Sequence, residues 1–150
     1  MAPGRSQRDH SRMTPTSDEL TTQIHTAMPL CALLGVRAAA FDAARCELEL
    51  EWRADLCTSA GLLHGGVLMA LADSAGAGCA FANLPDGAIG TTTIESKTNF
   101  LGAVTAGAVR AVATPLHAGR TTIVIETEVR RVADDRLVAK TTQTQAVLRG

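Results

Sequence analysis

Residues 62–81 read LLHGGVLMALADSAGAGCAF, and this stretch decides the fold. Between Gly66 and Ala82 the only polar side chains are those of Asp73 and Ser74. A helix formed by these residues is therefore apolar around its whole circumference. Such a helix belongs in the interior of a protein and not on its surface. The sequence predicts one long helix buried at the centre of the molecule.

The start of this helix has the composition of an oxyanion site. His64 is followed by Gly65 and Gly66, and glycines leave the first backbone N–H groups of a helix uncovered. These donors have no partner within the helix and lie at the positive end of its dipole, so they favour a negatively charged oxygen. Asp73 then places a carboxylate among apolar residues, where a charge is costly. We interpret these groups as a catalytic acid and an oxyanion donor.

The spacing along the helix separates these two groups. From Gly65 to Asp73 the chain rises about 12 Å along the helix axis and turns roughly 80° around it. One copy of the helix therefore cannot bring its own Gly65 amide and its own Asp73 to the same small group. Two copies that lie antiparallel across a twofold axis can. We expect Asp73 of one subunit to work against the helix N-terminus of the other.

The composition fits one compact domain and argues against several binding functions. The chain has 150 residues, 46% of them hydrophobic, and a formal net charge of -1. This balance gives no electrostatic footprint for nucleic acid or a membrane surface. An aromatic content of 3% argues against base-stacking platforms. Residues 1–15 are polar and predict a disordered tail without the apolar core of a signal peptide. Residues 16–150 are expected to form the single domain.

The cysteines show no CxxC or other metal-ligand spacing, and they are Cys31, Cys46, Cys57 and Cys79. They lie in apparent strands and helices, which favours free thiols in a reducing cytoplasm, where we expect the protein to work.

His64 and Asp73 are too far apart on one helix to share a metal ion, so we expect no metal site. Because Asp73 interrupts the longest apolar run, we predict no membrane span.

The remaining segments predict one more helix and six strands. Thr16 and Ser17 can cap a helix that runs to Met28. The expected strands cover residues 36–41, 47–52, 88–100, 104–116, 121–132 and 137–148. Antiparallel strands beside a single apolar helix predict an α+β fold whose sheet curls around that helix. The last strand is rich in Thr and Gln on both faces, which suggests that another subunit covers part of it.

Four segments carry a family resemblance: residues 61–66 (GLLHGG), 70–75 (ALADSA), 98–101 (TNFL) and 117–122 (HAGRTT). With this order of elements, the chain resembles the hotdog-fold acyl-CoA thioesterases over about residues 30–148. It is most similar to the PaaI-like branch, named for the phenylacetate-pathway thioesterase, and to its 4-hydroxybenzoyl-CoA relative. The most specific part is HGG followed by the acid of LAD, nine residues after the histidine.

The resemblance implies a hotdog fold, an antiparallel sheet wrapped around one long central helix, and hydrolysis of an acyl-CoA thioester to the free acid and CoA. It implies that Asp73 acts as nucleophile or as general base for water, and that the Gly65 amide polarises the thioester carbonyl. His64 would shape the loop or form a nearby hydrogen bond. Arg120, Thr121 and Thr122 fall where relatives contact the CoA phosphates or pantetheine arm.

The same resemblance implies the partners. Two subunits would pair their sheets into a homodimer, and the dimers would form a homotetramer. The partner molecule would be the acyl-CoA substrate, with no cofactor beyond the CoA that the substrate carries. The chain also departs from the family pattern, since Thr58 stands where relatives often carry Asn or Gln. Ala77 replaces a Thr of some members, and Gly102-Ala103 replaces a common Arg-Pro.

Other interpretations stay open for these residues. Asp73 could be a structural carboxylate, and Gly65 and Gly66 could serve packing alone. His64 either holds the loop backbone or transfers a proton directly. Cys57 and His64 lack the third group that would orient a thiol nucleophile, so we expect none.

Two further functions compete with thioester hydrolysis. A non-catalytic acyl-CoA binding or sensing protein could use the same fold, but binding gains nothing from a buried carboxylate at Asp73. A hydratase or dehydratase of this fold usually has another arrangement of His and acid. The identity of the acyl group does not follow from the sequence.

Overall fold

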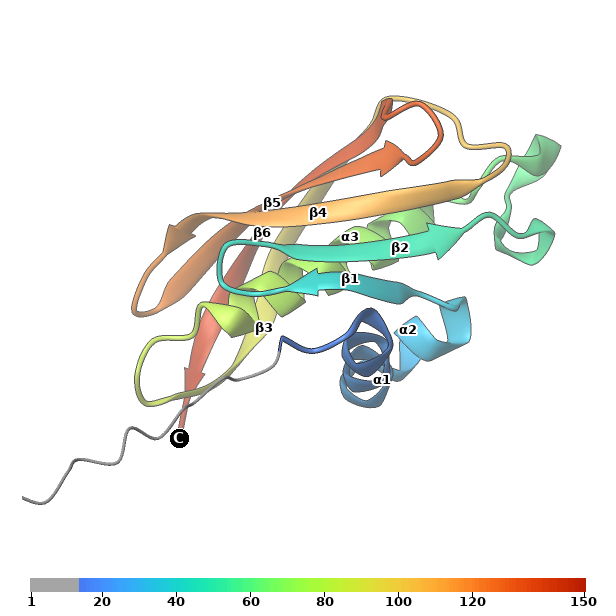
Figure 1. The fold of residues 1–150 in the computed structure, drawn as a ribbon. Coiled ribbons are helices and arrows are strands. Elements are labelled where there is room, and N and C mark those ends of the chain that lie inside the picture. The colour runs from blue at the N-terminus through green and yellow to red at the C-terminus, as the bar shows by residue number, and fades with distance from the viewer. Residues whose placement is uncertain (1–13) are drawn as a thin grey trace, which may run out of the picture.

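The computed structural model describes residues 14–150, which form a curved sheet with a long helix along its inner face (Figure 1). The predicted tail therefore lies outside the described residues, except for Thr14 and Pro15. The helices are α1 (Ser17–Ala27), α2 (Pro29–Leu34) and α3 (Gly65–Ala82). The strands are β1 (Arg37–Phe41), β2 (Cys46–Glu51), β3 (Ala88–Phe100), β4 (Ala108–Ala118), β5 (Thr122–Arg131) and β6 (Leu137–Arg149). This is the α+β architecture that the sequence predicts.

The central helix α3 lies where the apolar stretch places it, and it contacts all six strands. Leu71, Ala72, Ala75 and Cys79 are fully buried on it. Among residues 14–150, α3 alone has the length and apolarity of a membrane-crossing helix. Half of it is buried inside the protein, as expected for a core helix.

The sheet has the strand order β1-β2-β4-β5-β6-β3, and all neighbouring strands are antiparallel. In the β3–β6 pair, Thr93 lies opposite Gln145 and Glu95 lies opposite Thr144. Ile94 is therefore the extra residue of a β-bulge. The bulge keeps Thr93 on the inner face of the sheet and allows Ser96, opposite Gln143, to share that face.

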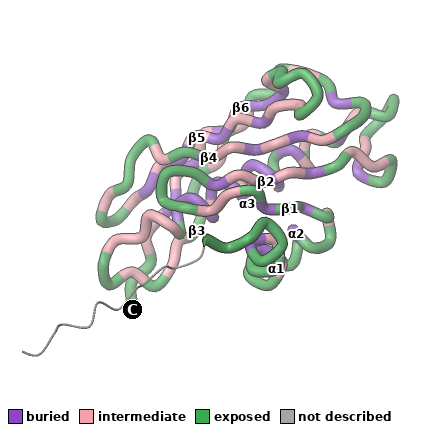
Figure 2. Tube along the Cα trace, in the orientation of Figure 1, coloured by how far each residue is buried: buried purple, intermediate pink, exposed green. Residues whose placement is uncertain are grey.

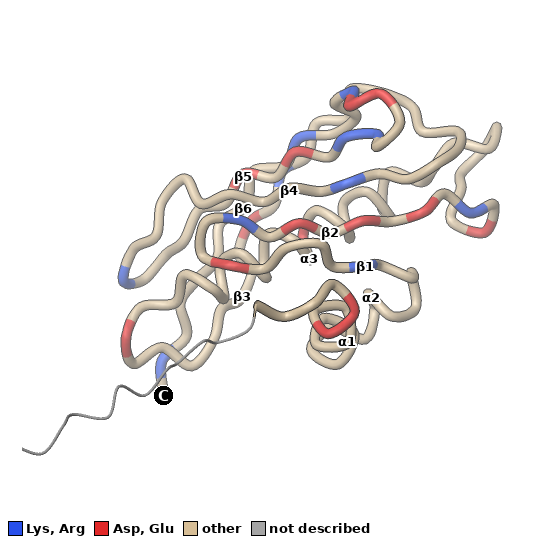
Figure 3. Tube along the Cα trace, viewed as in Figure 1, with Lys and Arg blue, Asp and Glu red and all other residues tan. Residues whose placement is uncertain are grey.

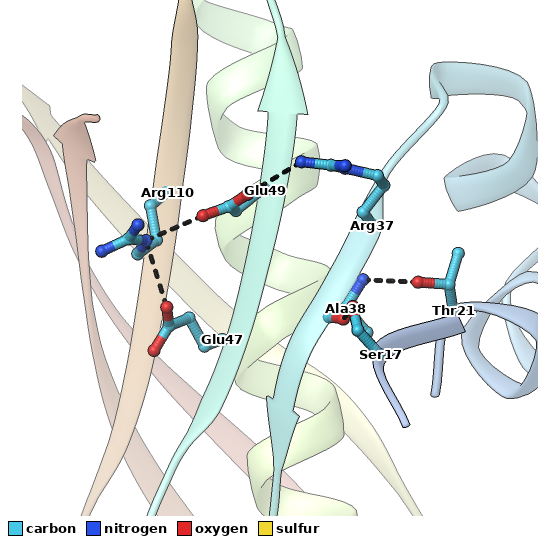
Figure 4. Close-up of polar contacts among 7 residues, drawn as sticks. All are labelled: Ser17, Thr21, Arg37, Ala38, Glu47, Glu49 and Arg110. Atoms are coloured by element: carbon cyan, nitrogen blue, oxygen red, sulfur yellow. Dashed lines mark hydrogen bonds and ion pairs between the residues drawn. The ribbon is translucent and has the colours of Figure 1, made fainter. Parts of the chain in front are cut away.

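The two edges of the sheet differ in their cover. At the β1 edge, the Ser17 hydroxyl donates to the Ala38 carbonyl at 2.6 Å, and the Ala38 N–H donates to Thr21 Oγ1 at 2.9 Å (Figure 4). Side chains of α1 thus satisfy both backbone groups of Ala38 in this edge strand. At the opposite edge, β3 pairs with β6 on one side only. Its outer side pairs with no segment of residues 14–150, and the strand exposes Ile89 and Ile94. An uncovered edge of this kind is open to pairing with another chain.

Charged side chains lie on the outer face, as the alternation in β2 predicts. Arg110 forms ion pairs with Glu47 at 3.1 Å and with Glu49 at 3.0 Å, and Arg37 reaches Glu49 at 3.2 Å (Figure 4). Leu48 and Leu50 of the same strand are buried against the core. Basic and acidic residues are interleaved over the described chain, so opposite charges lie near one another (Figure 3).

The inner face of β6 is polar as well as buried. Thr141, Gln143 and Gln145 are at most 1% exposed, and they alternate with half-buried residues along the strand (Figure 2). The sequence suggested another subunit as cover for this strand. For these three side chains, the cover comes from within the chain, since they lie on the inner face that α3 packs against.

Two element boundaries differ by three or more residues from those the sequence predicts, and the others differ by at most two. The central helix begins at Gly65 because Leu63 is extended, pairing with Cys57 and donating its N–H to the Val104 carbonyl at 2.9 Å. The fourth strand begins at Ala108 and not at 104, since residues 101–107 form a loop. Val104 is nevertheless buried, which explains the apolar signal at that position.

Candidate active site

His64 is the N-cap of α3. Its Nδ1 accepts the Gly66 N–H at 2.8 Å, and its carbonyl accepts the Val67 and Leu68 N–H groups at 2.9 and 3.2 Å. The His64 imidazole thus contacts the backbone at the start of the helix. Within residues 14–150, the Gly65 N–H donates to no backbone or side-chain acceptor. One amide at the positive end of α3 therefore remains free for a ligand oxygen.

Both glycines at the helix start lie against another group. A Cβ on Gly65 would lie 3.1 Å from the ring of Phe100, at the end of β3. A Cβ on Gly66 would lie 2.9 Å from His64 Nδ1 and would disturb the capping hydrogen bond. A Cβ at either position would thus press on a neighbouring side chain, and the absence of side chains leaves the Gly65 amide accessible.

Asp73 is half-buried in the middle of α3, and neutral donors hold one of its oxygens. Thr93 Oγ1 donates to Asp73 Oδ1 at 3.1 Å, and Gln143 Nε2 donates to the same oxygen at 3.2 Å. In the part of the chain that the structure describes, no lysine or arginine pairs with this carboxylate. Among these residues, Asp73 is therefore not held in an ion pair with an arginine.

The donors to Asp73 belong to a larger polar cluster. Gln145 Nε2 donates to Thr93 Oγ1 at 2.7 Å, so Thr93 links Gln145 to the carboxylate. A Cβ on Gly76 would lie 2.2 Å from Gln143 Oε1, so the Gln143 amide fills the space beside this glycine. Sequence reasoning missed Thr93, Gln143 and Gln145. The signal that could have found them is the alternation of polar residues along an otherwise buried strand, together with a glycine inside an apolar helix.

Thr58 and Cys57 lie on the loop that leads into α3. Thr58 is exposed, its N–H donates to the Leu62 carbonyl at 2.8 Å, and its side chain makes no capping hydrogen bond. The Cys57 thiol donates to the carbonyls of Arg53 and Gly61 and not to His64. The geometry thus gives no support to a Cys57–His64 nucleophile.

The segment 120–122 lies at the other end of the sheet from Gly65. The start of β4 lies beside the loop before α3, where the Trp52 N–H donates to the Gly107 carbonyl, whereas Arg120 follows the end of β4. Arg149 at the end of β6 donates to the Arg120 carbonyl at 3.2 Å. Within one chain, the structure does not bring Arg120, Thr121 and Thr122 to the Gly65 amide.

An apolar cavity of about 490 Å³ lies between α1 and α3. Leu20, Ile24 and Met28 of α1 line one side, and Ala77 and Thr91 line the other. Ala77 is one helical turn beyond Asp73, and Thr91 is the neighbour of Thr93 on the inner face of β3. The cavity therefore extends from the neighbourhood of the carboxylate. Among residues 14–150, no cluster of His, Cys, Asp and Glu has the geometry of a metal site.

Comparison with known proteins identifies the family. Residues 60–139, which include α3 and the Gly65 and Asp73 positions, match the family model described as Thioesterase superfamily. The chain belongs to the thioesterase superfamily. Its relatives include PA1618 of Pseudomonas aeruginosa, 31% identical over 83% of this chain and 83% of that protein, and ComA2 of Bacillus subtilis, 31% identical over 80% and 94%. Both relatives carry a provisional esterase name.

Solved structures agree with this thioesterase assignment. The thioesterase HI1161 of Haemophilus influenzae superposes with a TM-score of 0.80 at 26% identity, covering 91% of this chain and 92% of that one. A thioesterase family protein of Silicibacter pomeroyi gives a TM-score of 0.79 at 27% identity, covering 89% and 99%. The hotdog fold is thereby confirmed, and membership in the superfamily supports thioester hydrolysis as the general chemistry of this chain.

Proposed function

We propose that this thioesterase-superfamily chain hydrolyses an acyl-CoA thioester, with Asp73 as nucleophile or general base. The observation that carries the proposal is the environment of Asp73. Its carboxylate lies in an apolar helix, receives hydrogen bonds from two neutral donors on one oxygen, and pairs with no cation among the described residues. Its negative charge is therefore left available to attack a carbonyl carbon or to activate water.

We propose that the Gly65 amide of a second subunit holds the oxygen that becomes negative during the reaction. The Gly65 amide and Asp73 of one chain are about 12 Å apart along α3, so one chain does not complete the site. Two features support a twofold partner. The β3 edge is uncovered and exposes Ile94, and α3 exposes Met69, about one helical turn before Asp73.

This arrangement also accounts for the position of the remaining site residues. When two α3 helices lie antiparallel, the Arg120 end of one sheet comes beside the Gly65 end of the other helix. Arg120, Thr121 and Thr122 would then contact the CoA phosphates or pantetheine arm, with Arg149 adjacent to Arg120. His64 would orient the helix start, and Thr58 would lie at the rim of the site. No cofactor is needed beyond the CoA of the substrate.

The cavity beside α1 would hold the acyl group. Its volume of about 490 Å³ is in the range of small-molecule sites, and its lining is mostly apolar. An uncharged aliphatic or aryl acyl group fits this lining, whereas a carboxylate on the acyl chain would lose its hydration there. We further propose a PaaI-like enzyme of the cytoplasm, assembled as a homotetramer of such dimers.

The test is an assay for free CoA release from acetyl-, hexanoyl-, lauroyl-, benzoyl- and phenylacetyl-CoA. We expect the wild-type chain to hydrolyse at least one of them and Asp73→Asn to lose the activity while still binding the ester. Asp135→Asn, in the exposed β5–β6 turn, is the matched control and should retain activity. Binding of acyl-CoA without release from any ester would instead favour the non-catalytic acyl-CoA binding or sensing protein.

A further inference from the structure

We propose that Thr93, Gln143 and Gln145 are positioning residues that hold Asp73 Oδ1, so that Oδ2 is the oxygen that reacts. This inference rests on the proposed thioesterase function. The donors come from two neighbouring strands, β3 and β6, and all of them act on the same carboxylate oxygen. None of the described residues donates a hydrogen bond to Oδ2.

The hydrogen bonds have a defined direction. A glutamine Nε2 can only donate, so the Gln145 amide uses a lone pair of Thr93 Oγ1 at 2.7 Å. The single hydroxyl hydrogen of Thr93 then remains for Asp73 Oδ1 at 3.1 Å. Gln143 reaches Oδ1 directly at 3.2 Å. The carboxylate therefore has a direct contact from Gln143 and an indirect one from Gln145 through Thr93.

The burial of the two glutamines indicates that their amides are placed to position Asp73 and not to stabilise the core. Gln143 and Gln145 are 0% and 1% exposed, and Gln143 Oε1 has no partner among residues 14–150. A buried polar atom without a partner destabilises the folded state, and an apolar side chain of similar size avoids that cost. Gly76 moreover leaves room for the Gln143 amide, since a Cβ there would overlap it.

The consequence for catalysis is orientation. A carboxylate bound through one oxygen by donors from rigid strands cannot rotate freely about its Cβ–Cγ bond. Oδ2 is then presented in one direction, and a reacting group held in the productive geometry reacts far faster than a freely rotating one. Loss of these donors should lower the rate of the chemical step and leave acyl-CoA binding largely intact.

The first test replaces the Thr93 hydroxyl. We expect Thr93→Val to lower kcat by roughly 10- to 100-fold with KM nearly unchanged, and Thr93→Ser to restore most of the loss. Thr98→Val is the matched control because Thr98 lies on the same inner row of β3 but bonds to Thr141 at 2.8 Å. A merely structural threonine would show equal effects in both variants and no recovery in Thr93→Ser, and that result would overturn the proposal.

The second test separates the two contacts. Gln145→Met and Gln143→Met keep the length of the side chain and remove the donor. Because Gln145 acts through Thr93, Gln145→Met should lower kcat in the wild-type background and have no further effect in Thr93→Val. Because Gln143 acts directly, Gln143→Met should lower kcat in both backgrounds. Independent, additive effects of Gln145 and Thr93 would contradict the relay.

Failure of this inference is distinguishable from failure of the proposed function. If no acyl-CoA is hydrolysed by the wild-type chain, or if Asp73→Asn is fully active, the proposed function itself is wrong. If Asp73→Asn is inactive but Thr93→Val and Gln145→Met both keep the wild-type kcat, only the positioning role is wrong. Gln145→Met does not alter a group in contact with Asp73, so it provides the test even if Thr93→Val does not fold.

Discussion

The Gln143 side chain occupies the space that a side chain on Gly76 would need: a Cβ there would lie 2.2 Å from Gln143 Oε1. This relationship joins the central helix to β6 at the position where β6 contacts Asp73. Gly76 thereby determines where the Gln143 amide lies, and Gln143 is a donor to Asp73, the candidate catalytic acid.

The Gly76→Ala variant tests this relationship. Alanine favours a helix over glycine by about 1 kcal/mol, but overpacking a buried site costs typically 1–3 kcal/mol. Because the Gln143 amide must move, we expect a net loss of unfolding free energy and a fall in kcat. Urea unfolding and steady-state kinetics measure both. The double variant Gly76→Ala/Gln143→Ala should recover stability and not activity, whereas wild-type behaviour of Gly76→Ala would refute the described packing.

The Gly65 amide can be removed without removing a hydrogen bond of the helix. Gly65 is the first residue of α3, where proline is tolerated, and His64 has the extended backbone (ψ 133°) that a following proline requires. We expect Gly65→Pro to lower kcat by about 10²- to 10³-fold, the usual effect of losing one oxyanion donor. Gly65→Ala is the control, since it keeps the N–H and places a Cβ against Phe100. Equal losses in both variants would assign the effect to packing.

The open β3 edge should be the subunit interface. Ile94 is 62% exposed at the bulge of β3, and a lysine there would place a charge between the paired edges. We expect Ile94→Lys to reduce the molar mass in light scattering and to lower activity, because an isolated subunit lacks half of the site. Leu33→Lys is the matched control on α2, where Leu33 is 74% exposed. A monomeric Ile94→Lys variant with full activity would contradict the shared site.

Alkaline pH should destabilise the fold through three buried thiols. Burial raises the pKa of Cys46 from 9.0 to about 12, raises that of Cys79 to about 11, and also raises that of Cys31. Above pH 9 the unfolded chain loses these protons and the folded chain keeps them, so the unfolding free energy falls as pH rises. Each thiol contributes at most about 1.4 kcal/mol per pH unit. The chain contains no tyrosine, so phenol groups add nothing to this slope.

Urea midpoints at pH 8, 9 and 10 measure this effect. Cys46→Ala should give a shallower fall above pH 9, because one of the three buried thiols is removed. Cys57→Ala, which removes a thiol that is not fully buried, serves as the control for the loss of a thiol. An unchanged slope in Cys46→Ala would show that other groups cause the alkaline loss.

The parts of the fold that depend on local periodicity could be predicted from the sequence. The apolar circumference of α3, the alternation in β2 and the Thr16 cap of α1, which forms a capping box with Glu19, are all present as expected. His64 and Gly65 at the helix start could likewise be identified, since capping is a local property. The predicted roles of Asp73, Gly65, His64, Thr58 and residues 120–122 in the reaction remain predictions.

The donors around Asp73 could not be predicted in this way. A strand is oriented from its sequence by placing its apolar residues on the inner face of the sheet. Gln143 and Gln145 do not follow this rule, so they suggested contact with another subunit. Their actual environment depends on the antiparallel pairing of β6 with β3, on the bulge at Ile94 and on the space beside Gly76. These are contacts between segments distant in sequence, which composition and periodicity do not specify.

The central claim is that each active site joins Asp73 of one subunit to the Gly65 amide of the other. The most direct measurement uses mixed dimers of Asp73→Asn and Gly65→Pro subunits, purified through two different affinity tags. In a mixed dimer with twofold symmetry of the backbone, one site carries both changes and the other carries neither. We predict about half of the wild-type kcat per dimer, although each variant alone keeps at most about 1% of it. Mixed dimers as inactive as their parents would contradict the shared site.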